Sequence, residues 1–258
     1  MKKILLPLLS CAVILLSACS NEAVHDSYSA YREQTAKDLY FSAKKDLQKG
    51  HEDMAVKKLE ALNTLYPFGI YSEEGSINLV YAYYKNDNPD EALAAADRYL
   101  RLYPRGHYAD YAYYMKGIVS LKQGLSWAQR KVGVELASRD LTNVKEAYMS
   151  FSQLVSAFPD SAYAPDAIAR MKYIRNVFAK KEADIADFYY QRKAYVAAAN
   201  RASAVVSHYD RSPYVIKALV IMVKSYRKLG LTQQENDTLK VFEASYPNDP
   251  QLKKLMRR

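Results

Sequence analysis

Tyr66-Pro67 closes one helical segment of this sequence, and the same aromatic–proline pair returns at Tyr103-Pro104, Phe158-Pro159 and Tyr246-Pro247. Tyr209-Asp210 occupies a fifth equivalent position. Two of the intervals between these aromatic residues are 37 residues long, and a motif with such a period is typical of stacked supersecondary units. Because proline cannot continue the hydrogen-bond ladder of a helix, each pair predicts the end of a helix.

Residues at fixed offsets before these pairs predict how the units are built. The positions twelve residues before the second residue of each pair are Ala55, Ala92, Ala147, Ala198 and Glu235. Twelve residues further back, the first, second and fifth units carry Ala43, Val80 and Val223. Small residues at these offsets fit the tetratricopeptide pattern, in which two antiparallel helices touch closely. We therefore predict an all-α, tetratricopeptide-type solenoid of about five helix pairs, a class that generally serves as a binding scaffold.

Two units are longer than the 37-residue period. The third contains an insertion at residues 125–144, with Trp127 and Ser138-Arg139-Asp140, which either carries a function or is a packing excursion. In the fourth, we expect an extra linking helix at about Asp166–Phe178, joining two sub-bundles. The predicted halves are residues 36–160, with units one to three, and residues 161–258, with the linking helix and units four and five.

The N-terminus predicts export. A basic start, an apolar run from Ile4 to Leu16 and a small-residue exit describe a signal peptide over residues 1–18. The run is shorter than the roughly 20 residues of a membrane-spanning helix. Leu16-Ser17-Ala18-Cys19 resembles the lipobox of bacterial lipoproteins, which implies diacylglycerol and an N-acyl chain on Cys19 and a tether over residues 19–35. The alternative is an ordinary signal peptide with a chance cysteine.

Ser20, which follows that cysteine, resembles the pattern that sorts lipoproteins to the outer membrane. The expected location is therefore the outer membrane, with the chain anchored by lipid and facing the periplasm.

Composition and motifs disfavour an enzyme. Cys11 would leave with the signal peptide and Cys19 would carry lipid, so no thiol remains for a disulfide, a nucleophile or a metal site. The four histidines are scattered, and no phosphate-binding or nucleophile-elbow motif occurs. We expect no enzymatic activity, no metal and no cofactor apart from the covalent lipid. The formal net charge of +9 is dispersed along helices, which favours solvated faces over nucleic-acid binding.

Tyrosine is the residue type that the sequence offers for recognition, with 24 copies. In the tetratricopeptide register, the concave face of the first three units carries a set of tyrosines and lysines: Tyr40, Lys44, Tyr81, Tyr84, Lys85, Tyr111, Tyr114 and Lys122. Amphipathic rings beside cations suit an extended peptide with aromatic residues and a terminal carboxylate. The alternative is that these rings pack against neighbouring helices.

Longer matches lie along the whole chain. They include Tyr66-Pro67-Phe68-Gly69, Tyr81-Ala82-Tyr83-Tyr84-Lys85-Asn86 and Ala194-Tyr195-Val196-Ala197 followed by Asn200-Arg201. With the lipobox and five units, the chain resembles the BamD (ComL) family of the outer-membrane β-barrel assembly (BAM) machinery. The resemblance implies binding of BamA, association with lipoproteins such as BamE, and reception of C-terminal signals of unfolded outer-membrane proteins. It also implies that Arg201, with Asn200, contacts BamA.

Other functions stay open at this point. Another tetratricopeptide lipoprotein, serving pilus assembly, cell division or peptidoglycan or DNA handling, would share the anchor and the repeats. Without the resemblance, Arg201 reads as an exposed helix arginine.

Overall fold

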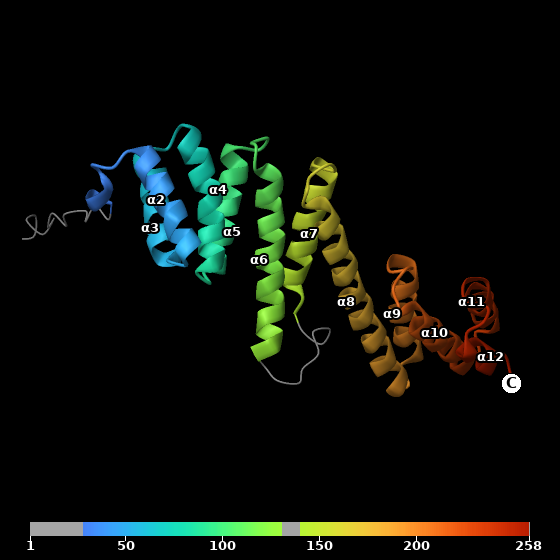
Figure 1. Ribbon diagram of the computed structural model, residues 1–258. Helices are drawn as coiled ribbons and strands as arrows, with labels where there is room; N and C mark the ends of the chain where they lie inside the picture. Colours follow the sequence, from blue (N-terminus) through green and yellow to red (C-terminus); the bar gives the residue numbers. More distant parts are fainter. Residues whose placement is uncertain (1–27, 131–139, 258) are drawn as a thin grey trace, which may run out of the picture.

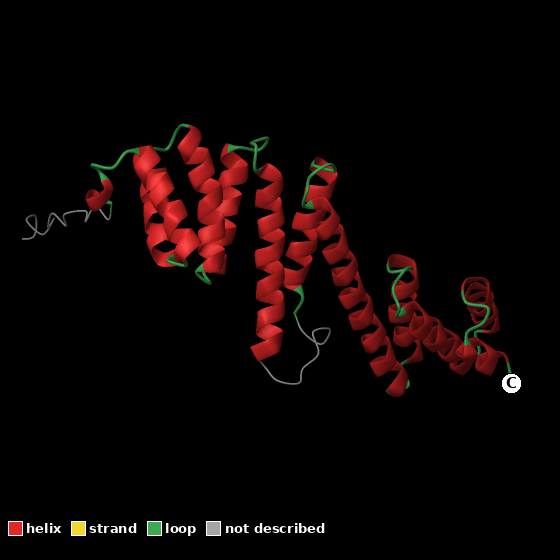
Figure 2. Ribbon diagram, in the orientation of Figure 1, coloured by secondary structure: helices red, strands yellow, loops and turns green. Residues whose placement is uncertain are grey.

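The computed structural model describes residues 28–130 and 140–257, with the backbone alone at residues 125–130. Within these ranges the regular structure is entirely helical: eleven α-helices and one 3-10 turn (Figures 1 and 2). The elements are η1 (Ser29–Tyr31), α2 (Ala36–Lys49), α3 (Glu52–Leu65), α4 (Ile70–Lys85), α5 (Pro89–Leu102), α6 (Ala109–Arg130), α7 (Thr142–Ala157), α8 (Ala164–Gln191), α9 (Tyr195–His208), α10 (Val215–Leu229), α11 (Thr232–Ser245) and α12 (Pro250–Met256).

The helices form five antiparallel pairs that stack along the chain (Figure 1). The pairs are α2–α3, α4–α5, α6–α7, α8–α9 and α10–α11, and α12 packs on the last pair. The core is correspondingly divided into four hydrophobic clusters in chain order. Each unit therefore depends mainly on its neighbours, as in a solenoid, and the predicted fold class is confirmed.

The aromatic–proline pairs end the second helix of their units, as predicted. In each pair the aromatic residue is the C-cap, and its backbone N–H donates to the carbonyl four residues earlier: Tyr66 to Leu62, Tyr103 to Tyr99, Phe158 to Leu154 and Tyr246 to Phe242. The following proline has no N–H to donate, so the helix stops there.

The turns inside the units also follow the sequence. Gly50 and Gly230 end α2 and α10 with φ of 74° and 71°, in the left-handed region that glycine adopts without steric cost. Asp87 and Lys193 take the equivalent positions of units two and four, with φ of 57° and 63°.

The predicted small residues lie where paired helices touch. Ala55, Ala92, Ala147 and Ala198 are all 0% exposed. In the third unit the same close approach involves Gly117 on α6, because a Cβ atom added there would lie 2.3 Å from the ring of Phe151 on α7.

Gly117→Val is therefore expected to lower the free energy of unfolding by about 3 kcal/mol, since the buried ring leaves no room for the added methyl groups. Urea unfolding followed by circular dichroism measures this change. Phe151→Leu in the same chain should make the valine less costly, whereas an unchanged midpoint for Gly117→Val alone would contradict the close contact.

One expected element is corrected. The separate linking helix predicted at Asp166–Phe178 is the first half of α8, a continuous helix of 28 residues. Pro165 stands in its first turn, where proline is tolerated, and neither proline nor glycine follows before Gln191. The additional length of unit four therefore extends one helix and adds no turn.

The structure describes only part of the predicted insertion at 125–144 and only part of the N-terminal segment at 1–35. Residues 125–130 of the expected insertion continue α6, while Ser138 and Arg139 lie outside the described residues, as does the side chain of Trp127. Asp140 accepts hydrogen bonds from the Thr142 backbone N–H at 3.0 Å and from its hydroxyl at 2.7 Å, at the start of α7. The signal peptide at 1–18 and Cys19 also lie outside the described part.

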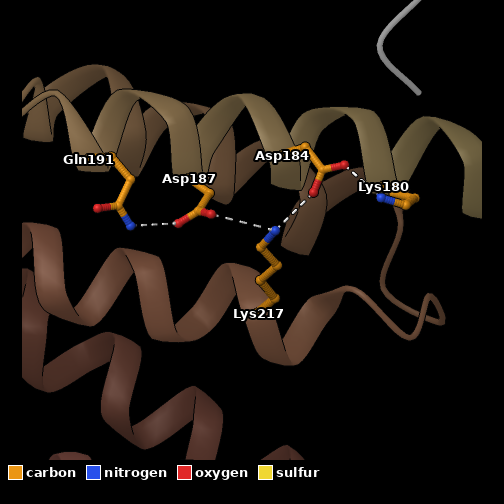
Figure 3. A network of polar contacts seen from close by, with 5 residues as sticks. All are labelled: Lys180, Asp184, Asp187, Gln191 and Lys217. Carbon is orange, nitrogen blue, oxygen red and sulfur yellow. Dashed lines mark hydrogen bonds and ion pairs between the residues drawn. The ribbon is translucent and has the colours of Figure 1, made fainter. Parts of the chain in front are cut away.

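A polar network joins α8 to α10 (Figure 3). The Asp184 carboxylate receives hydrogen bonds from Lys180 and Lys217, each at 2.8 Å, and Lys217 also lies 3.9 Å from Asp187. Burial alone would raise the pKa of Asp184, but the hydrogen bonds from the two lysines hold this pKa below its usual value. This network holds the first helix of unit five against the C-terminal half of α8.

Candidate partner-binding surfaces

The first helices of units one to three form a tyrosine-lined cavity of about 320 Å³. Four of the predicted residues line it: Tyr40, Lys44, Tyr81 and Tyr111. Five further residues complete the lining: Glu74, Ile77, Asn78, Tyr108 and Tyr163. This cavity, here called the tyrosine cavity, brings α2, α4 and α6 together with the start of α8.

Four predicted residues, Tyr84, Lys85, Tyr114 and Lys122, lie outside this lining. Tyr114 stacks on Tyr163, with ring centroids 4.9 Å apart, and its hydroxyl donates to Asp166 at 2.8 Å. Tyr84 lies under the ammonium of Lys122, 4.9 Å from the ring centroid. Lys85 is exposed at the end of α4. Tyr114 therefore supports the wall of the tyrosine cavity, while Tyr84 makes a separate cation–π contact.

The tyrosine cavity carries aromatic rings, neutral hydroxyl groups, a carboxylate and an ammonium group. Tyr40 is only 5% exposed, and its burial together with the Glu74 carboxylate raises its pKa to about 12. Burial likewise raises the pKa of Tyr111, so both phenols stay neutral hydrogen-bond donors at physiological pH. The Lys44 ammonium lies 5.9 Å from the centroid of the Tyr40 ring. Such a wall can hold an aromatic side chain and also bond to a peptide backbone.

The sequence analysis did not predict the contribution of Glu74, which is the second of two adjacent acidic residues, Glu73 and Glu74, on α4. The two carboxylates lie in different surroundings. Glu73 accepts hydrogen bonds from the Tyr99 hydroxyl at 2.9 Å and the His107 backbone at 3.2 Å, whereas Glu74 lines the cavity. Helical spacing could have predicted its position, because Glu74 precedes Tyr81 by two turns and so lies on the same face of α4.

Tyr108 and Tyr163 were missed for another reason. Each immediately precedes the first helix of its unit, at α6 and α8, and so lies outside the helical register used for the concave face. Tyr214 stands in the same place before α10. Because a tyrosine recurs directly before the first helix of these units, the repeat pattern could have predicted Tyr108 and Tyr163 as a related pair of positions.

In the C-terminal half, Asn200 and Arg201 are exposed on α9. The Arg201 guanidinium lies 3.0 Å from the Glu182 carboxylate on α8, and its side chain is 49% exposed. An exposed pair of this kind contributes little to stability, roughly 0–1 kcal/mol. Glu182 therefore positions the guanidinium without burying it.

A groove of about 400 Å³ lies along the first half of α8. It is lined by Tyr148, Val155, Ile168, Met171, Lys172, Arg175, Asn176, Tyr209, Arg211 and Ser212. Ile168, Arg175 and Glu182 are spaced by two helical turns, so this face of α8 continues to the Glu182–Arg201 pair. Because α9 has 14 residues against the 28 of α8, it cannot cover the whole length of that helix. The sequence analysis did not predict this groove, here called the α8 groove.

Within the described ranges, no group of three or more histidine, cysteine or acidic residues could hold a metal ion. No described helix is long and apolar enough to cross a membrane.

Comparison with known protein sequences places this chain in a family. The sequence profile of the YfiO family, described as "Outer membrane lipoprotein", matches residues 32–254. The outer membrane protein assembly factor BamD of Neisseria meningitidis serogroup B is 35% identical over 258 residues, which cover 100% of this chain and 96% of the relative. The chain belongs to the BamD family. The BamD of Haemophilus influenzae is 34% identical over 230 residues, covering 86% of this chain and 88% of that protein.

The chain is also similar to solved structures with lower sequence identity. PilW, a type IV pilus biogenesis factor, has 15% sequence identity and a TM-score of 0.37, covering 89% of this chain and 87% of that chain. MamA has 15% identity and a TM-score of 0.35, covering 82% of this chain and 95% of that chain. Membership of the BamD family therefore rests on sequence, and it associates the chain with the outer membrane.

Proposed function

We propose that this BamD-family chain is a scaffold of the outer-membrane β-barrel assembly machinery and works by binding, without bond chemistry. The observation that carries the proposal is the family match over residues 32–254, a range that contains helices α2 to α11 and most of α12. Two separate surfaces, the tyrosine cavity and the exposed Arg201 region, give such a scaffold a place for each of two partners.

The anchor in this proposal is lipid on Cys19. Diacylglycerol and an N-acyl chain on the cysteine hold the chain on the periplasmic side of the outer membrane, since several acyl chains bind a bilayer far more firmly than one. Confinement to that surface raises the effective concentration of the chain for membrane partners.

The tyrosine cavity receives the C-terminal segments of unfolded outer-membrane proteins. Aromatic residues in such a segment would stack on the rings of Tyr81 and Tyr111, and Lys44 would attract a terminal carboxylate. Glu74 repels a carboxylate beside it and so favours a backbone N–H at that end of the cavity.

The C-terminal half binds BamA through Arg201 and Asn200, and lipoproteins such as BamE associate with the same assembly. Lys172 and Arg211 extend the positive charge of this surface into the α8 groove, where Arg175 is paired with Asp210 at 3.3 Å. An acidic region of a partner that pairs with Arg201 would meet complementary charge along α8.

Tyr81→Ala is expected to weaken binding of a peptide from the C-terminus of a porin about tenfold, because the cavity loses one aromatic contact of about 1.4 kcal/mol. Fluorescence anisotropy of the labelled peptide measures this affinity. Tyr84→Ala is the matched control: its ring lies on the same helix but outside the cavity, so the affinity should change little. Equal losses from the two variants would return Tyr81 to a packing role.

The assembly function is tested by a mild-detergent pull-down of the lipidated protein from native membranes, with mass spectrometry of the proteins that remain bound. Recovery of BamA with small lipoproteins supports the proposal. Recovery of pilus, cell-division or peptidoglycan-handling proteins in place of BamA would retain an anchored scaffold with a different task.

A further inference from the structure

Three large apolar side chains are exposed at the N-terminal end of the solenoid. Phe68, in the α3–α4 connection, is 88% exposed, Ile70 at the start of α4 is 71% exposed, and Phe41 on α2 is 49% exposed. The Phe41 ring lies 6.0 Å from that of Tyr71, the neighbour of Ile70, so the exposed side chains of α2 and α4 lie close together. Phe41, Phe68 and Ile70 are here called the Phe68 patch.

The fold does not require these residues, as the other repeats demonstrate. The position of Phe68, directly after the proline or its equivalent, is occupied in the later units by polar residues: Arg105, Asp160, Arg211 and Asn248. The position of Ile70 is His107 in the second unit, at the same kind of helix–helix connection. Because exposed apolar clusters mark interaction sites, the apolar residues at these two positions of the first unit point to a surface contact at this end of the solenoid.

The chain leading to Cys19 enters the solenoid at the first unit, the unit that carries this patch. The Tyr66 hydroxyl donates to the Gln34 carbonyl at 2.7 Å, which fixes the segment before α2 next to the residue that precedes Pro67-Phe68. Tyr28 follows Cys19 by nine positions, and a chain of that length spans at most about 30 Å. A lipid on Cys19 therefore keeps the first unit close to the bilayer, while the C-terminal units lie at the opposite end of the molecule (Figure 1).

Cations flank the patch. Lys37 and Lys45 lie four residues before and four after Phe41, so they share its side of α2, and both are exposed. Exposed aromatic and aliphatic side chains with lysines around them match the boundary between phospholipid headgroups and acyl chains, where the apolar groups enter and the cations meet phosphate.

We propose that the Phe68 patch inserts into the phospholipid leaflet of the outer membrane as a second membrane contact. The proposal rests on the anchoring by Cys19 proposed above. The lipid supplies attachment, and the patch sets orientation, with the α3–α4 connection of the first unit against the bilayer.

The full-length lipidated protein in pure phospholipid vesicles tests this contact. Trp127→Phe removes the single native tryptophan, and Phe68→Trp then places a reporter in the patch. Asn248→Trp in the same background is the matched control, because it occupies the equivalent position of the last unit. We expect the Phe68→Trp reporter to emit at shorter wavelength in vesicles and to be quenched several-fold more by brominated phospholipids than the Asn248→Trp reporter.

Vesicle flotation separates the two proposals. Protein that floats with the vesicles while its Phe68→Trp reporter stays unquenched overturns insertion of the patch and leaves the anchor intact. Protein that does not float overturns both. A reporter that is shielded only after purified BamA is added, and not by lipid alone, overturns the lipid contact in favour of a protein one.

Discussion

A chain carrying Arg201→Glu is expected to lose BamA from the membrane pull-down while keeping its helical content. Breaking a charge pair at an interface costs about 2–5 kcal/mol, so affinity should fall at least about 30-fold. The fold should tolerate the change, because the Arg201 side chain is 49% exposed and loss of its partly exposed pair with Glu182 costs roughly 1 kcal/mol or less. Quantitative mass spectrometry of the pull-down and far-ultraviolet circular dichroism give the two measurements.

Glu182→Gln is the matched control for this variant. It removes the intramolecular partner of Arg201 but keeps the exposed guanidinium, so BamA should remain bound. If Arg201→Glu recovers as much BamA as the unaltered chain, Arg201 is no more than an exposed helix arginine. If Glu182→Gln loses BamA equally, the pair acts by shaping the α8–α9 surface and the guanidinium does not contact the partner itself.

Arg227→Ala is expected to destabilise the C-terminal units by about 3 kcal/mol, since it removes the cation nearest to a buried carboxylate. The Glu235 side chain is only 3% exposed, and the Arg227 guanidinium lies 2.7 Å from it. Glu235 stands at the offset where the first four units have alanine, so this acid is buried by the close approach of two helices. Arg227 also donates to the Leu255 carbonyl at 3.0 Å, which holds α12. Urea unfolding measures the loss.

The residue that the other units have at the position of Glu235 suggests a second substitution that should offset the loss of stability. Glu235→Ala gives unit five the residue that the other units have at this offset, so the double variant with Arg227→Ala should regain much of the lost stability. A double variant no more stable than Arg227→Ala alone would mean that the contact with α12, and not the buried charge, accounts for the effect.

Local and periodic features of the fold could be predicted from the sequence. The aromatic–proline pairs predicted helix ends because proline acts on its own turn, and the alanines predicted helix contacts because their offsets recur. The linking helix was mispredicted because counting residues gives the additional length but not its form. No residue between Asp166 and Gln191 breaks a helix, and that absence was the better guide.

The candidate binding residues divide in the same way, into those that local register predicts and those that depend on contacts between units. Tyr40, Lys44, Tyr81 and Tyr111 were predicted to share a surface because first-helix positions face the concave side, and all four line the tyrosine cavity. Tyr163 and the α8 groove depend on how unit three meets α8, which is a relation between units of unequal length. No spacing within one unit contains that information.

The continuity of α8 restricts how cargo could pass between the two surfaces. Asp166, near the tyrosine cavity, and Glu182, beside Arg201, are sixteen residues apart on one unbroken helix, a separation of about 24 Å along its axis. Because no loop interrupts this rod, the two ends cannot close on each other as jaws do. A strand bound at the tyrosine cavity, as proposed, would have to cross this separation along α8 to reach a partner bound at Arg201.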